Sequence, residues 1–147
     1  MRARCSMTDR YAVLAQICHE FNVAVLYAFG SRAQEVYEWV TRSSAELSPG
    51  PADVDVGVKA VSGVKWTVTD KVRLSIALED LFAVNRVDLV VLNTADPFLA
   101  EEVIRGARLY ARDEYEADEY DLYVLRRAGD LAPLEHEWLS DILRAGL

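Results

Sequence analysis

Three short apolar segments, separated by stretches with helical periodicity, set the fold that this chain can adopt. Val23–Phe29 is an almost continuous apolar run, which is typical of a strand buried on both faces. Asp53–Val58 alternates between valine and other residues, which is the period of a strand, and Arg86–Leu92 has a similar pattern. Strands that alternate with helices predict an α/β (α+β) fold, in which a small mixed β-sheet is flanked by helices.

The helices between these strands are predicted from apolar spacing and from capping residues. Spacings of three and four predict a first helix over Thr8–Phe21, with Thr8 as its N-cap, and a further helix around Trp39. The same spacing predicts a helix over Thr69–Phe82. Asp96 before a proline is a strong helix start, and that helix should end at Gly106. A loop is predicted over Ser43–Pro51, where serine, proline and glycine cluster.

The last part of the chain is predicted to form a short strand and two C-terminal helices. Leu109–Ala111 could add the strand, the acidic and aromatic segment from Asp113 should be helical up to Gly129, and Leu131–Leu147 has the pattern of one more amphipathic helix. We therefore expect a single domain over residues 1–147, with a core over about 8–112 and a helical extension over 113–147. The acidic run of the extension is interpreted as a solvated helix face.

The charge balance restricts the class of ligand. The 147 residues carry a formal net charge of −8, whereas proteins that bind long nucleic acids neutralise phosphates with lysine and arginine. This balance argues against a processive polymerase or a DNA-binding module. It is compatible with one nucleoside triphosphate and Mg²⁺, because the metal supplies the positive charge. We therefore expect a nucleotide and another protein as partners and no long nucleic acid, and a homo-oligomer is left open.

A cytoplasmic location without membrane contact is the default expectation. The longest apolar stretch, Val23–Phe29, is too short to span a bilayer, and Asp9 and Arg10 interrupt any secretory signal near the start. Cys5 and Cys18 are the two cysteines of the chain and do not have the spacing of a zinc site.

A glycine-serine turn stands where the first strand passes into a helix. Gly30 allows the backbone to approach a ligand closely, and the free N–H groups of a helix start favour phosphate. Ser31 adds a hydroxyl donor, and Arg32 could reach phosphate oxygens. The alternative is an ordinary turn without a ligand.

Three aspartates follow on two later strands. Asp53 and Asp55 project from the same face because residues i and i+2 of a strand share a face. Asp88, between valine and leucine, is costly to bury unless it is paired or binds a metal. If the two strands are neighbours, the three carboxylates could hold two Mg²⁺ ions roughly 3.5–4 Å apart. Two ions at this separation stabilise the attacking and leaving oxygens of a phosphoryl transfer. The alternatives are a solvated strand edge and a salt bridge from Asp88 to Arg86 or Arg73.

The Gly-Ser turn, the Asp-x-Asp pair and the aspartate of a later strand, in this order, resemble the DNA polymerase β-type nucleotidyltransferase superfamily. The resemblance is closer to the minimal nucleotidyltransferase (MNT) proteins, which are often antitoxins paired with HEPN-type ribonuclease toxins. It spans about Val23 to Asp113, through the segments LYAFGSRA, ADVDVGV, VDLVVLN and EEVIRGARLYARD. The resemblance implies a polymerase β-like nucleotidyltransferase fold for the single domain.

The same resemblance implies a role for each site residue. The Gly-Ser turn would hold the triphosphate of ATP or another NTP, and Arg32 matches the arginine that commonly follows it. Asp53 and Asp55 would bind Mg²⁺, and Asp88 would complete the metal site and act as the base. The chain departs from the MNT group in a longer segment before Asp53 and in Ala52, where a serine is common.

Three functions follow as expectations. The first is a Mg²⁺-dependent nucleotidyltransferase that transfers a nucleoside monophosphate (NMP), with AMP as the expected group, to a hydroxyl of a protein partner. The resemblance implies that this partner is a HEPN toxin. The second is a nucleotidyltransferase that modifies a small molecule such as an aminoglycoside. The third is a binding-only antitoxin that neutralises its partner without catalysis.

Overall fold

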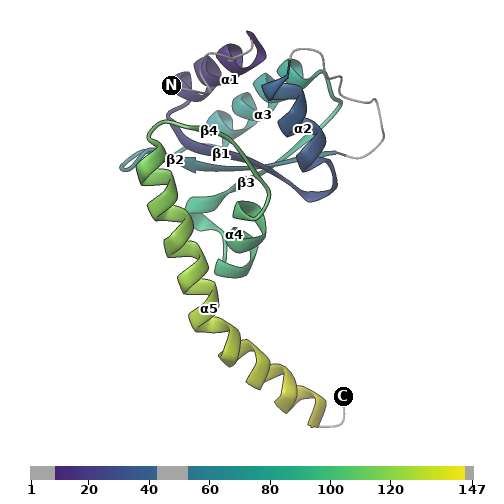
Figure 1. The fold of residues 1–147 in the computed structure, drawn as a ribbon, viewed down its shortest axis with the longest axis vertical. Coiled ribbons are helices and arrows are strands. Elements are labelled where there is room, and N and C mark those ends of the chain that lie inside the picture. The colour runs from purple at the N-terminus through teal and green to yellow at the C-terminus, as the bar shows by residue number, and fades with distance from the viewer. Residues whose placement is uncertain (1–8, 43–52, 145–147) are drawn as a thin grey trace.

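A computed structural model describes residues 9–42 and 53–144 of the chain. The loop predicted over Ser43–Pro51, the predicted N-cap Thr8 and the substituted position Ala52 lie outside the described residues. In chain order the elements are α1 (Asp9–Glu20), β1 (Val23–Phe29), the 3-10 turn η2 (Gly30–Arg32), α2 (Ala33–Thr41), β2 (Val54–Ala60), α3 (Val68–Phe82), β3 (Val87–Val91), the 3-10 turn η3 (Leu92–Thr94), α4 (Pro97–Ile104), β4 (Ala107–Ala111) and α5 (Glu114–Arg144) (Figure 1).

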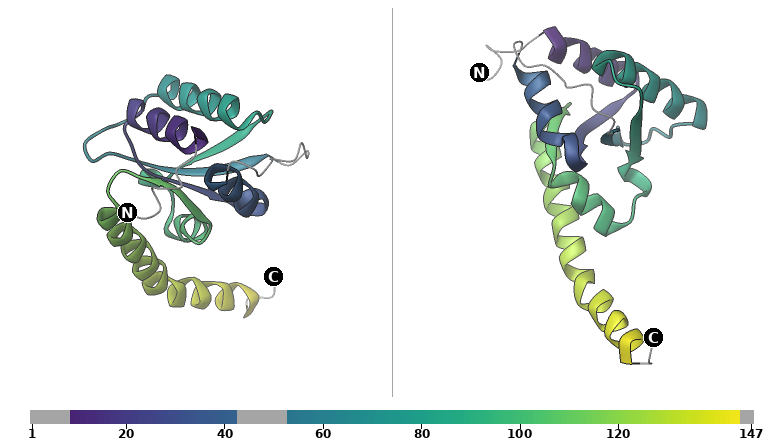
Figure 2. Two further views of the ribbon diagram at one scale, coloured as in Figure 1. Left: turned by 45° about the horizontal axis from the view of Figure 1, so that its top comes forward. Right: turned by 90° about the vertical axis from the view of Figure 1, so that its right-hand side faces the viewer.

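The strands form one four-stranded mixed sheet in the order β3-β2-β1-β4, which confirms the predicted fold class. β1 pairs antiparallel with β2 and with β4, whereas β2 and β3 are parallel. Figure 2 shows α1 and α3 on one side of the sheet and α4 and α5 on the other. The sheet is therefore the middle layer, and its two faces lead to two different sets of helices.

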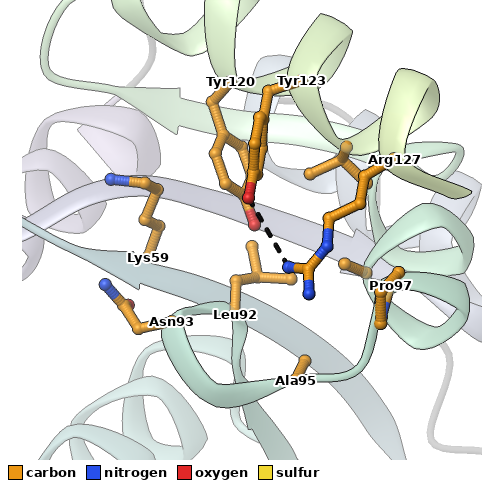
Figure 3. A pocket seen from close by; sticks show the side chains of 10 residues that line it. Lys59, Leu92, Asn93, Ala95, Pro97, Tyr120, Tyr123 and Arg127 are labelled. Atoms are coloured by element: carbon orange, nitrogen blue, oxygen red, sulfur yellow. Dashed lines mark hydrogen bonds between the residues drawn. The ribbon is translucent and has the colours of Figure 1, made fainter.

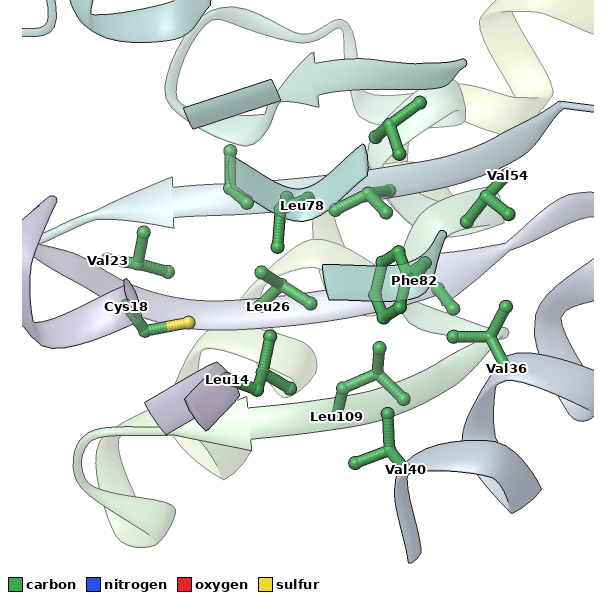
Figure 4. Packing of buried hydrophobic residues seen from close by; sticks show 14 of the residues in the cluster. Leu14, Cys18, Val23, Leu26, Val36, Val40, Val54, Leu78, Phe82 and Leu109 are labelled. Carbon is green, nitrogen blue, oxygen red and sulfur yellow. The ribbon is translucent and has the colours of Figure 1, made fainter. Parts of the chain in front are cut away.

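The alternation of residues along β2 decides which side chains reach each face. Val54, Val56 and Val58 are fully or almost fully buried in the core under α1, α2 and α3 (Figure 4). Because side chains alternate along a strand, Asp55 and Lys59 project from the opposite face, where α4 and α5 pack. The polar residues of β2 thus stand on the α4 side of the sheet.

Side-chain caps fix where two of the helices begin. The Thr67 hydroxyl accepts from the Asp70 amide at 3.1 Å and the Asp70 carboxylate accepts from the Thr67 amide at 2.9 Å, which is a capping box. The Asp96 carboxylate accepts from the amides of Phe98 and Leu99 at 2.9 and 3.0 Å. The helix start predicted at Asp96 is therefore confirmed, with the proline at the first helical position.

The two predicted C-terminal helices are instead one helix, α5, of 31 residues, which continues through Gly129 and Pro133. A glycine inside a helix costs about 1 kcal/mol relative to alanine, which weakens the helix without ending it. Proline removes one backbone hydrogen bond and bends a helix, and α5 changes direction along its length (Figure 2). The part of α5 toward Arg144 extends away from the sheet (Figure 1).

Arg108 of β4 anchors the first turns of α5. Its guanidinium lies 2.8 Å from Glu114, 3.0 Å from Asp118 and 2.7 Å from Asp121. The buried hydroxyl of Tyr27 on β1 donates to Asp121, and burial, followed by this hydrogen bond, raises the pKa of the Tyr27 phenol. The side chains of Glu114 and Asp118 stay 73% and 67% exposed, as expected of a solvated face, whereas Asp121 is 26% exposed and turns toward the sheet.

No helix within the described ranges is both long enough and apolar enough to cross a membrane.

Candidate active site

The parallel pairing of β2 with β3 brings the three predicted aspartates to one end of the strand pair. Asp55 and Asp88 are direct register partners, and Asp53 comes one residue before β2 begins. The Val54 amide donates to the Arg86 carbonyl at 3.3 Å, which holds the two strand starts together beside Asp53. The neighbouring strands that the sequence reasoning required are therefore present.

Arg86 lies between two of these carboxylates. Its Nε is 3.0 Å from Oδ1 of Asp88 and 3.7 Å from Oδ2 of Asp53, and its side chain is 68% exposed. The salt bridge that the sequence left open for Asp88 is thus made by Arg86, whereas Arg73 lies over the ring of Phe21. The Arg86 guanidinium compensates part of the negative charge of the cluster.

The surroundings of Asp55 disfavour the charged form of its carboxyl group. Burial raises the pKa of its carboxyl group, and the negative charges of Asp88, Asp53 and Glu102 raise it further. Glu102 comes from α4 and was not recognised in the sequence. A glycine inside the alternating strand, Gly57, was an available signal, because such a glycine marks close approach by another element.

Gly30 is required by its contact with Asp55. Its φ of +77° is in the left-handed region, and a Cβ at this position would lie 2.4 Å from Oδ2 of Asp55. Phe29, the residue before it, is the register partner of Asp55 across β1 and β2. The glycine therefore allows the turn to pass directly beside the carboxylate, which any other residue would displace.

A cavity of about 360 Å³ opens next to this turn. Its lining includes Gly30, Ser31 and Gln34 from the turn and α2, Glu102 from α4, and Arg105 and Gly106 directly after α4. Ser31 is exposed at the cavity wall. None of the three aspartates lines this cavity. Its link to them is through Gly30, which lies beside Asp55, and through Glu102, whose charge acts on Asp55.

Arg32 and Arg105 have different positions relative to this cavity. Arg32 is 6% exposed, is not among the lining residues, and its Nε donates to Glu35 at 3.1 Å. Arg105 lines the cavity, is 66% exposed and binds Glu101 at 2.7 Å. The direct contact of Arg32 with phosphate stays a prediction. Arg105 was missed because an arginine at a helix end has no local pattern that marks it.

The chemistry of these donors fits a metal ion that arrives with its ligand. Among residues 9–42 and 53–144, no group of three His, Cys, Asp or Glu side chains forms a ready cage for a metal. Mg²⁺ does not need one, since it is usually held by one or two carboxylates together with substrate phosphates and water. Arg86 compensates only part of the negative charge around Asp55, and the remainder favours a cation at this place.

Comparison with known proteins shows one family for most of the chain. Residues 13–115 match the family model described as polymerase beta, nucleotidyltransferase. No curated protein matches the chain.

Solved structures of toxin-antitoxin complexes contain chains with a similar fold. A MntA-HpeT complex in which two aspartates, two positions apart, are replaced by glutamate has a TM-score of 0.68 and 15% identity, over 90% of this chain and 98% of that chain. A toxin-antitoxin structure with AMP-PNP has a TM-score of 0.68 and 16% identity, over 90% and 98%. A complex of the tri-AMPylated HEPN toxin of Shewanella oneidensis with MNT antitoxin has a TM-score of 0.64 and 15% identity, over 91% of this chain and 96% of that chain.

Proposed function

This chain belongs to the polymerase beta nucleotidyltransferase family, and on that premise we propose that it transfers a nucleoside monophosphate, AMP before others, from an NTP to a hydroxyl of a protein partner. One observation carries this proposal: Asp55 and Asp88 are register partners, and Asp55 lies directly beside the turn at Gly30. The three aspartates and the phosphate-binding turn are the two parts that transfer from an NTP needs.

The roles of the residues follow from their positions. The backbone and hydroxyl at Ser31 bind triphosphate oxygens, and Arg105 adds a positive charge at the cavity wall. Arg32 supports the turn through its bond to Glu35. Asp53, Asp55 and Asp88 hold Mg²⁺, with two ions proposed.

The reaction is one displacement at phosphorus. The hydroxyl oxygen of the acceptor forms a bond to the α-phosphorus, and the bond from that phosphorus to the bridging oxygen breaks. Pyrophosphate leaves with the electron pair, and Asp88 accepts the hydroxyl proton. Bound Mg²⁺ supplies neutralisation of the phosphate charge. The remaining catalysis is the positioning of the two reactants by the turn and the cavity.

A HEPN-type toxin is the proposed partner. The fold is shared with antitoxin complexes, one of which contains an AMPylated HEPN toxin, and this likeness supports both AMP as the transferred group and a toxin as the acceptor. The net charge of −8 supports a protein acceptor over a long nucleic acid.

The test is an incubation with Mg²⁺ and each NTP labelled at the α-phosphate, with and without the product of the neighbouring gene. We expect label on the partner and release of pyrophosphate, both lost in Asp53→Asn and Asp88→Asn. Asp80→Asn, which removes one exposed carboxylate from α3, should keep both. If wild type and Asp53→Asn neutralise the partner equally and no label appears on the partner, the chain is instead a binding-only antitoxin. Label on an aminoglycoside but not on the partner would establish a small-molecule enzyme.

A further inference from the structure

A second pocket, of about 280 Å³, lies between the end of β2, the start of α4 and the side of α5. Figure 3 shows Tyr120, Tyr123 and Arg127 entering it from α5, with Lys59 of β2 and Asn93 on the other side. Its remaining lining is apolar and comes mainly from η3 and α4. Cavities with an apolar lining and a few converging polar groups are typical of small-molecule sites.

This pocket is separate from the aspartate cluster. A Cβ at Gly57 would lie 2.3 Å from Cγ1 of Val103, so the Val103 side chain rests on the strand between Asp55 and Lys59. Pro97 and other residues near the start of α4 line the second pocket, whereas Glu102 lines the cavity beside Ser31. Helix α4 thus divides the two cavities, and a ligand in one does not occupy the other.

The charge of the second pocket is opposite to that of the aspartate cluster. No carboxylate lines it, and neither Lys59 nor Arg127 forms an ion pair with any residue that the structure describes. Asp121, next to Tyr120 in the chain, is already bound by Tyr27 and Arg108. In a chain with a net charge of −8, two cations without a carboxylate partner at one pocket favour an anionic ligand.

The tyrosines give the pocket an aromatic wall. The ring centroids of Tyr120 and Tyr123 are 6.4 Å apart, and Nζ of Lys59 lies 5.4 Å from the centroid of Tyr120. Arg127 donates to the Tyr123 hydroxyl at a long distance of 3.5 Å, which leaves its other N–H groups able to bind a ligand. A flat ring could therefore pack against the tyrosines while its charged group meets the two cations.

We propose that this pocket binds a small organic anion that carries a flat ring, at a site distinct from the one that binds the NTP. Lys59 and Arg127 bind the carboxylate or phosphate of the ligand, and Tyr120 and Tyr123 pack against its ring. The volume of about 280 Å³ is close to the lower limit of ligand cavities, roughly 300 Å³, which restricts the ligand to a compact molecule such as a nucleoside monophosphate.

The test is calorimetric titration of the full chain carrying Asp53→Asn, without divalent metal, with three probes: AMP, adenosine and inorganic phosphate. We expect AMP to bind more tightly than either of the others, because only AMP has both the ring and the charge. The pair Lys59→Ala and Arg127→Ala should weaken AMP binding about tenfold or more, since two charge-assisted contacts are lost. The pair Lys65→Ala and Arg126→Ala is the matched control, because it removes the same charge at exposed positions outside the pocket.

The conservative pair Lys59→Gln and Arg127→Gln, checked by circular dichroism, separates loss of charge from loss of fold and should weaken AMP binding as the alanine pair does. Equal binding of AMP by the parent and by either pocket pair overturns the proposal, as does the absence of AMP binding at millimolar concentration. Loss of AMP binding in Ser31→Ala but not in the pocket variants would place the ligand in the other cavity and also overturn it. These results do not depend on transfer activity, so they are independent of the proposed function.

Discussion

Asp55 and Asp88 are register partners on the parallel strands β2 and β3, so two carboxylates from different strands project side by side. Neither residue depends on a loop for its position, because each belongs to a strand of the sheet. Arg86 compensates Asp88 and Asp53 by ion pairs, while the pKa of Asp55 is raised by burial and by its acidic neighbours. The repulsion among the acidic side chains therefore acts on the carboxylate of Asp55 and destabilises its charged form.

Replacement of Asp55 by asparagine should stabilise the metal-free protein. The folded-state pKa of Asp55 is raised, so this carboxyl favours folding when it is protonated at acidic pH, and that contribution is lost as pH rises through the raised pKa. At neutral pH the carboxylate opposes folding. We expect Asp55→Asn to raise Tm at neutral pH by a few degrees and to have no such effect at acidic pH. Asp80→Asn, at an exposed position of α3, is the control and should leave Tm nearly unchanged at both pH values.

Replacement of Gly30 by alanine should damage the site more than it strains the backbone. Gly63 offers a matched control, because its φ of +86° is also left-handed but a Cβ there meets nothing within 4 Å. Gly63→Ala should cost about 1 kcal/mol of unfolding free energy from backbone strain alone. Gly30→Ala adds the clash with Asp55 and should cost more, with loss of nucleotide transfer. Equal losses of stability and activity in the two variants would contradict this account.

Asp53 and Asp55 were predictable from the sequence because the relationship between them is local. The side-chain period of a strand places Asp53 and Asp55 on one face regardless of the rest of the fold. Asp88 required only that β3 pair with β2, which is the usual arrangement when a helix connects two parallel strands. The alternation of strands and helices along the chain was likewise enough to predict the fold class, a mixed sheet flanked by helices.

The contributions of α4 and α5 were not predictable, because they depend on how helices pack on the sheet. Glu102 and Arg105 reach the cavity only because α4 lies on Gly57, and no local pattern marks either of them. Gly129 was expected to end a helix, yet its cost is too small to interrupt one as long as α5. Asp121 has the pattern of a solvated helix face like its acidic neighbours, and only the position of Arg108 on β4 shows that it turns inward.

Removal of Arg108 should loosen α5 from the sheet. Arg108 is 21% exposed and binds three acids, so Arg108→Met leaves Asp121 near Tyr27 without its cation. Breaking the pair with Asp121, in which the two side chains are 21% and 26% exposed, costs up to about 3 kcal/mol. The pairs with the exposed Glu114 and Asp118 add little. Arg105→Met, which breaks one exposed pair with Glu101, should cost less than about 1 kcal/mol. Urea unfolding measures both values, and hydrogen exchange should show faster exchange in α5 only for Arg108→Met.

Arg86 should compete with a metal ion for the aspartates. Its Nε lies 3.0 Å from Asp88 and 3.7 Å from Asp53, so a cation that binds these carboxylates must displace the guanidinium or share them with it. We expect Arg86→Gln to bind Mn²⁺ more tightly than wild type, measured by the loss of free Mn²⁺ signal in electron paramagnetic resonance. Because Arg86 is 68% exposed, its loss should lower the unfolding free energy by less than about 1 kcal/mol.

A control variant, Arg126→Gln, distinguishes a general effect of charge on Mn²⁺ affinity from competition between Arg86 and the metal ion. Arg126→Gln removes the same charge from an exposed position of α5, so it should leave Mn²⁺ affinity close to that of wild type. An equal gain in affinity in both variants would mean that the overall charge, and not the ion pairs, controls metal binding. Weaker Mn²⁺ binding in Arg86→Gln would mean that Arg86 holds Asp53 and Asp88 at the separation that the metal needs, which is the opposite role.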